Sequence, residues 1–105
     1  MKAFKIKIRI HFPKKNLFHD KTEKFKLYVY VPDEWNKKRI EYFAFEAARE
    51  YIKKFYPFTF KKGTFKLNMI DFEEKHYIKK DVKVYTYNHK EKCGKWVTNR
   101  YAINL

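Results

Sequence analysis

The stretch Lys2–Phe12, KAFKIKIRIHF, alternates apolar and polar side chains almost without interruption. Its apolar positions are Phe4, Ile6, Ile8, Ile10 and Phe12. The positions between them carry Lys5, Lys7, Arg9 and His11. A period of two over this length predicts a strand with one face in the core and the other toward solvent. Pro13 ends the pattern.

Residues 24–31, KFKLYVYV, repeat the alternation. One face holds Phe25, Leu27, Val29 and Val31, and the other holds Lys24, Lys26, Tyr28 and Tyr30. The two stretches are therefore expected to be antiparallel neighbours, joined by a basic loop that carries Lys14 and Lys15.

A long helix is predicted next. Pro32 closes the second strand, Asp33 is a suitable N-cap, and Pro57 prevents continuation beyond about Phe55 or Tyr56. The apolar stripe at helical spacing comprises Ile40, Phe43, Ala44, Ala47, Ala48, Tyr51, Ile52 and Phe55. Acidic residues 33 and 34 would then complement the N-terminal end of the helix dipole.

The remaining chain predicts more strands. Residues 58–60 and 64–72 are expected to be strand segments around a turn at residues 61–63, whereas residues 73–81 stay unassigned. A terminal hairpin is expected from residues 82–87 and 95–103. The prediction is one α+β domain over residues 1–105: a mostly antiparallel sheet of four to six strands with one long helix on one face, in the order β-β-α-β-β-β.

The charge is unevenly distributed. The 105 residues include 26 Lys and Arg against 12 Asp and Glu, a net charge of +14. Residues 1–30 carry +7, residues 31–60 carry +1 and residues 61–105 carry +6. The helical segment is thus nearly neutral, which argues against a recognition helix in the major groove and favours a sheet or loop surface. Such an excess favours a polyanionic partner, and nucleic acid is the leading hypothesis.

The predicted nucleic-acid interface comprises the sheet face away from the helix and the basic loop after Pro13. Such an interface needs cations for phosphates and flat rings for stacking. The candidate residues are Lys5, Lys7, Arg9, Lys14, Lys15, Lys24, Lys26, Tyr28, Tyr30, Lys83, Tyr85, Trp96 and Arg100.

Two other functions remain open. The exposed aromatics could instead anchor a small effector or inhibitor on a host protein or on a nucleic-acid-binding enzyme. A metal-independent ribonuclease needs only an acid, a base and cations. Its candidate groups are His11, His76, His89, Tyr85 and Arg100.

The amino-acid composition excludes several kinds of catalytic or binding site. The chain has no serine and only two glycines, which excludes a serine nucleophile and a glycine-rich phosphate loop. The single cysteine, Cys93, allows no internal disulfide, and neither a metal nor a cofactor is expected. No signal peptide or membrane span is expected, so the protein is expected in the cytoplasm, or in the host cytoplasm if viral. The sequence is compatible with a viral, archaeal or thermophilic source. It does not distinguish a monomer from a homodimer.

Overall fold

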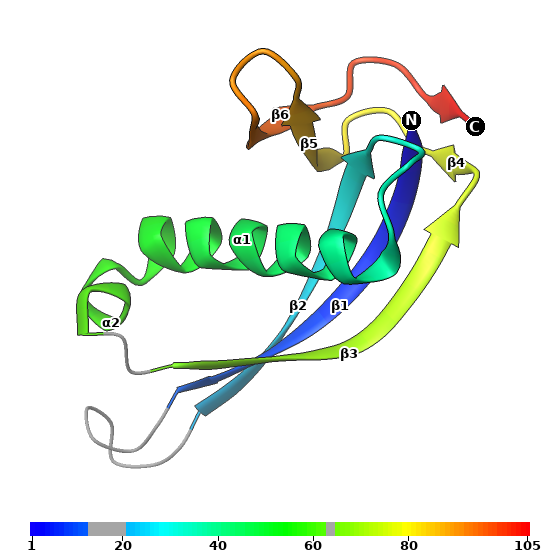
Figure 1. The fold of residues 1–105 in the computed structure, drawn as a ribbon. Helices are drawn as coiled ribbons and strands as arrows, with labels where there is room; N and C mark the ends of the chain where they lie inside the picture. Colours follow the sequence, from blue (N-terminus) through cyan, green and yellow to red (C-terminus); the bar gives the residue numbers. More distant parts are fainter. Residues whose placement is uncertain (13–20, 63–64) are drawn as a thin grey trace.

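The computed structural model describes residues 1–12, 21–62 and 65–105. Its elements are β1 (Lys2–Phe12), β2 (Lys21–Val31), α1 (Lys37–Phe55), α2 (Pro57–Lys62), β3 (Lys66–Lys75), β4 (Tyr77–Ile78), β5 (Lys83–Asn88), β6 (Cys93–Thr98) and β7 (Ile103–Asn104). The fold is α+β, with one long helix against a mostly antiparallel sheet, as the sequence predicts (Figure 1).

The main sheet has five strands in the order β3-β1-β2-β5-β6. β1 pairs antiparallel with β2 and with β3, and β5 pairs antiparallel with β6. The detailed order differs from the prediction, because β2 and β5 run parallel and β3 returns to the far edge beside β1. β1 is therefore an interior strand, paired on both edges, and its apolar positions are buried in the cluster that includes α1.

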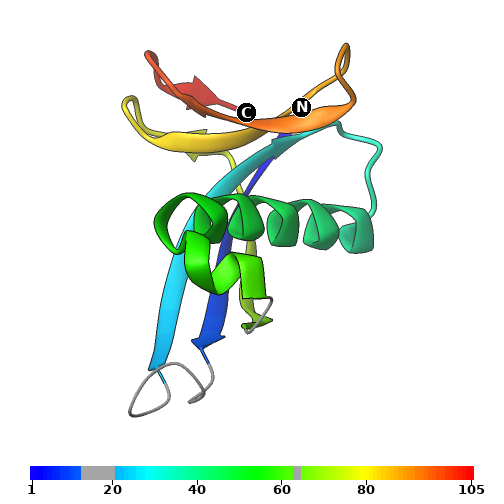
Figure 2. The same ribbon diagram turned by 90° about the vertical axis from the view of Figure 1, so that its left-hand side faces the viewer.

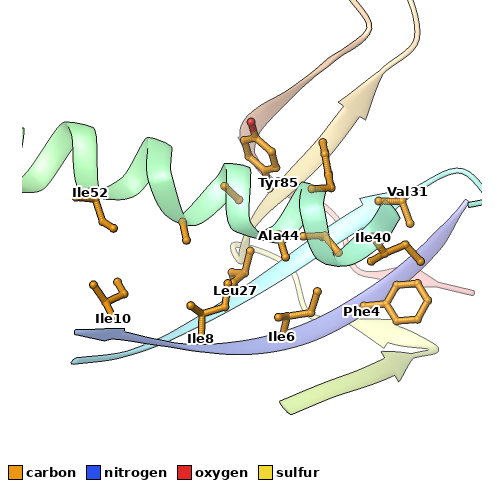
Figure 3. Close-up of a cluster of buried hydrophobic side chains, with 14 of the residues drawn as sticks. Phe4, Ile6, Ile8, Ile10, Leu27, Val31, Ile40, Ala44, Ile52 and Tyr85 are labelled. Atoms are coloured by element: carbon orange, nitrogen blue, oxygen red, sulfur yellow. The ribbon is translucent and has the colours of Figure 1, made fainter. Parts of the chain in front are cut away.

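The core lies between the sheet and α1. Ile6, Ile8 and Ile10 of β1 point toward Ala44 and Ile52 of the helix, as Figure 3 shows. All five side chains are completely buried. Burial of each isoleucine contributes about 1.5–3 kcal/mol to the free energy of unfolding, so the period-two pattern fixes which face of β1 meets the helix.

The helix starts later than predicted. Asn36, not Asp33, is the N-cap, and its side-chain Oδ1 accepts a hydrogen bond from the Arg39 N–H at 2.9 Å. Asp33 instead pairs with the N-terminal ammonium of Met1 at 3.0 Å. Residues 32–35 form a turn, in which the Trp35 N–H donates to the Pro32 carbonyl at 3.3 Å. The helix begins only after this turn. Its first turn consequently carries no acidic residue.

The segment predicted as a strand at residues 58–60 is helical and belongs to α2. Pro57 stands at the first position of this helix, where its fixed φ is favourable and its missing N–H costs nothing. The Phe60 N–H donates to the Tyr56 carbonyl at 2.9 Å. Of the predicted turn, residues 61 and 62 end α2, and Gly63 lies outside the described residues.

A second, smaller cluster covers part of the other sheet face. β4 and β7 form a two-stranded antiparallel sheet, and Ile78 of β4 packs with Ala3 of β1 and Val84 of β5. The predicted hairpin is confirmed as β5 and β6, but its last residues form β7. Within the described part of the chain, neither helix is long and apolar enough to cross a membrane.

Candidate functional site

Four cations form two adjacent cross-strand pairs on the sheet face away from α1. Lys7 of β1 lies opposite Lys26 of β2, and Arg9 lies opposite Lys24. Residues two apart on a strand are about 6.8 Å apart, so the two pairs form successive rungs. We call Lys7, Arg9, Lys24 and Lys26 the basic ladder.

Within the described ranges 1–12, 21–62 and 65–105, none of these four cations is neutralised by an ion pair. Among the residues that the structure describes, no carboxylate oxygen lies within 4.0 Å of their side-chain nitrogens. Arg9, Lys24 and Lys26 are exposed, and Lys7 is half-buried. Directly opposed like charges destabilise an antiparallel pair, so this arrangement raises the free energy of the isolated protein.

The third strand of this face, β3, adds the cation Lys66 and the carboxylates Asp71 and Glu73. On β3, Asp71 lies opposite Lys7 and Asn68 lies opposite Arg9, while Lys66 lies opposite His11. Lys66 was not among the residues predicted for the interface, although its alternation with Leu67 places it on this face. Asp71 offsets part of the charge of Lys7, and the basic ladder still carries a clear excess of positive charge.

Lys5 sits between the basic ladder and the smaller cluster. It is half-buried, with Tyr28 opposite on β2 and Glu73 opposite on β3. Tyr28 and Tyr30 do lie on the face away from α1, but both are half-buried against the cluster around Ile78. The open aromatic surface predicted at these tyrosines is therefore largely covered.

Three residues predicted for the nucleic-acid interface lie instead on the sheet face that packs against α1. They are Lys83, Tyr85 and Trp96. The parallel pairing sets Val84 opposite Tyr28, so Tyr85 points toward α1, and Lys83 lies on the same side. Trp96, opposite Tyr85, also packs in the main core. The register of the parallel β2–β5 pair, which the sequence does not specify, decides this placement.

Tyr85 is part of the core rather than of an open surface. It is 3% exposed, and its hydroxyl donates to Glu46 Oε2 at 2.9 Å. Burial, together with the carboxylate of Glu46, raises the pKa of Tyr85. Arg100 is exposed in the segment after β6, outside the basic ladder, and Lys14 and Lys15 lie outside the described residues.

A groove of about 420 Å³ lies beside β2, between α1 and the β5–β6 hairpin. It is lined by residues 25–27 of β2, by Tyr51, Lys54 and Phe55 of α1, and by Lys83 and Trp96. Figure 2 shows α1 passing in front of β1 and β2 with this hairpin at their upper end. We call this feature the edge groove.

Two of the histidines proposed for a ribonuclease, His11 and His76, lie near opposite ends of β3. His11 lies opposite Lys66 at the start of β3, whereas His76 follows the end of the same strand. Nine residues of extended chain separate these points by roughly 30 Å. The third histidine, His89, lies in the β5–β6 turn. Acid and base on one phosphate therefore cannot come from His11 and His76 in this arrangement.

The described residues contain no group of three or more His, Cys, Asp or Glu placed to hold a metal ion. Cys93 is exposed, and its sulfur lies 3.7 Å from Glu91 Oε2. Partial desolvation and the Glu91 carboxylate raise the pKa of the Cys93 thiol, which disfavours the reactive thiolate.

Searches with the chain found no matching protein-family model, no matching characterised protein and no matching solved structure.

Proposed function

We propose that the protein binds nucleic acid through the basic ladder, by contacts to the phosphate backbone. The observation that carries this proposal is the pair of opposed rungs, Lys7–Lys26 and Arg9–Lys24, without ion-pair partners in the described chain. A polyanion that approaches this face relieves the repulsion and releases its own counterions, so both effects favour binding.

The available side chains favour phosphate contacts over base stacking. Tyr28 and Tyr30 are the aromatic residues of β2 on this face, and both are half-buried beside Ile78. Stacking platforms need accessible ring faces. Duplexes carry one charge per about 1.7 Å of axis, so we expect duplexes to bind more tightly than single strands, with little sequence preference.

Fluorescence anisotropy with labelled duplex and single-stranded DNA and RNA tests the proposal. The informative variant combines Lys24→Gln and Lys26→Gln, which removes two exposed charges from the basic ladder. The matched control combines Lys38→Gln and Lys53→Gln, two exposed lysines of α1 on the other side of the sheet. We expect the first variant to weaken binding by at least tenfold, about 1.4 kcal/mol, and the control to weaken it much less.

Equal weakening by the two double variants would show that net charge alone drives binding, and would contradict a defined interface. Absence of binding by the unmodified protein at low salt would contradict the proposal as a whole.

A further inference from the structure

Among the strands of the described chain, β2 has an open edge along part of its length. On the side away from β1, it pairs with β5 only at residues 28–30. No strand of the described chain pairs with that side of β2 over residues 22–27, because β5 begins only at Lys83, opposite Thr98 of β6. Outward-pointing N–H and C=O groups along this length form a template for another strand.

The edge groove exposes this open backbone. Its wall includes three successive residues of β2, Phe25, Lys26 and Leu27. Successive side chains of a strand point to opposite faces, so three in a row can line one groove only along the strand edge. The groove therefore continues the line of β5 beside β2, where a sixth strand segment would lie.

The two sides of this edge differ in chemistry. Toward α1, the groove is lined by the rings of Phe25, Tyr51, Phe55 and Trp96. Phe25 stacks on Tyr51 with ring centroids 4.3 Å apart, and Phe55 remains 55% exposed. Toward the other face, Lys24 and Lys26 stand along the same edge and are exposed.

The charges of the groove are predominantly positive. Lys26, Lys54 and Lys83 line it, against one carboxylate, Glu50. No ion pair engages these three lysines within the described ranges. An occupant with negative charge is thus favoured over a neutral or basic one.

We propose that the edge groove binds an extended acidic segment of a partner protein, which adds a strand to β2. Backbone hydrogen bonds to the open edge supply affinity, as in other cases of strand addition. Alternate apolar side chains of the segment enter the aromatic side of the groove, while the acidic side chains between them face Lys24 and Lys26. The open length of residues 22–27 accommodates about six residues, or roughly 20 Å. This proposal does not depend on nucleic-acid binding.

The test uses the full chain and a labelled peptide of about eight residues that alternates glutamate with leucine. Two control peptides replace the glutamates by lysines, or replace two central residues by proline, which removes backbone donors. Anisotropy measures binding, and amide hydrogen exchange reads the β2 edge directly. We expect the acidic peptide to bind, the controls to bind at least tenfold more weakly, and alternate amides within residues 22–27 to become protected.

Protein variants distinguish the groove from general attraction by a basic surface. Lys26→Glu reverses a charge that lines the groove and faces the acidic side chains of the peptide, and Lys53→Glu reverses an exposed lysine of α1 that does not line the groove. Lys26→Glu is expected to weaken peptide binding at least tenfold, and Lys53→Glu by less than threefold.

Equal binding of the proline peptide, or unchanged amide exchange in β2, would overturn strand addition. A dimer that blocks the peptide and dissociates on Phe55→Glu would also overturn the proposal, because a second copy of the chain would then be the occupant.

Discussion

Lys7 and Lys26 lie directly opposite each other on β1 and β2, on the sheet face that α1 does not cover. The next rung repeats the relationship with Arg9 and Lys24. Cross-strand partners have Cβ atoms about 4.5–5.5 Å apart, so these charges repel unless a counterion or ligand intervenes. This repulsion across two consecutive rungs is the observation on which the proposed nucleic-acid interface rests.

Lys26→Glu is expected to raise stability and lower nucleic-acid affinity at the same time. The substitution converts a repulsive cross-strand pair into an attractive one, worth about 0.2–1 kcal/mol in the free energy of unfolding. Urea unfolding measures the first effect, and anisotropy with a DNA duplex measures the second. A variant that loses both stability and affinity would indicate that Lys26 acts through folding alone.

Gly94→Ala is expected to destabilise the β5–β6 hairpin. A Cβ at Gly94 would overlap the ring of Tyr85 and would lie 2.7 Å from Cε1 of Phe43. Both rings belong to the main core, so neither can move without disturbing α1. We expect a loss of about 1–3 kcal/mol in urea unfolding, typical of an overpacked core. An unchanged midpoint would contradict the close packing of Gly94 against these rings.

Lys38→Glu is expected to stabilise the protein. The first turn of α1 carries Lys37, Lys38 and Arg39 without an acidic residue, which opposes the helix dipole. A carboxylate near the helix N-terminus contributes about 0.3–1 kcal/mol. Thermal unfolding should therefore show a higher Tm, and Lys38→Gln should give a smaller rise. A lower Tm for Lys38→Glu would contradict the placement of the helix start.

Stability is expected to fall at alkaline pH through Tyr56. Its hydroxyl donates to Glu23 Oε1 at 2.8 Å, and this hydrogen bond raises the pKa of Tyr56 to about 12. The unfolded value is about 10, so the neutral phenol is favoured in the folded state. The resulting stability is complete below about pH 10 and is lost as the pH rises to about 12.

Tyr56→Phe provides the comparison for this prediction. It removes the titrating group, so the stability difference between the two proteins should shrink between about pH 10 and about pH 12. Urea unfolding across this range measures the difference. A constant difference would contradict the hydrogen bond between Tyr56 and Glu23.

Strong periodicity made the first half of the fold predictable. The alternation in β1 and β2 identified the buried face correctly, and the end of α1 follows from Pro57. The helix start was wrong because a local turn at Pro32 competes with the capping ability of Asp33. α2 was missed because aromatic and β-branched residues also suit strands, and Pro57 was interpreted only as a helix terminator.

The candidate site was less predictable than the fold. Lys7, Arg9, Lys24 and Lys26 share one face because β1 and β2 are sequence neighbours with a simple register. The positions of Tyr85 and Trp96 depend on the parallel pairing of β5 with β2, a long-range contact without a local sequence signal. The edge groove lies beside β2 because β5 begins at Lys83 and pairs with β2 only at residues 28–30. The periodicity of the sequence does not indicate where this pairing starts.

The salt dependence of duplex DNA binding tests the central claim most directly. Each phosphate contact contributes about −0.9 to the slope of log K against log salt concentration, so four contacts from the basic ladder predict a slope of about −3.6 or steeper. The double variant of Lys24→Gln and Lys26→Gln should bind with a slope shallower by about 2. Equal slopes for the two proteins would show that these lysines do not contact phosphates, and would contradict the proposed interface.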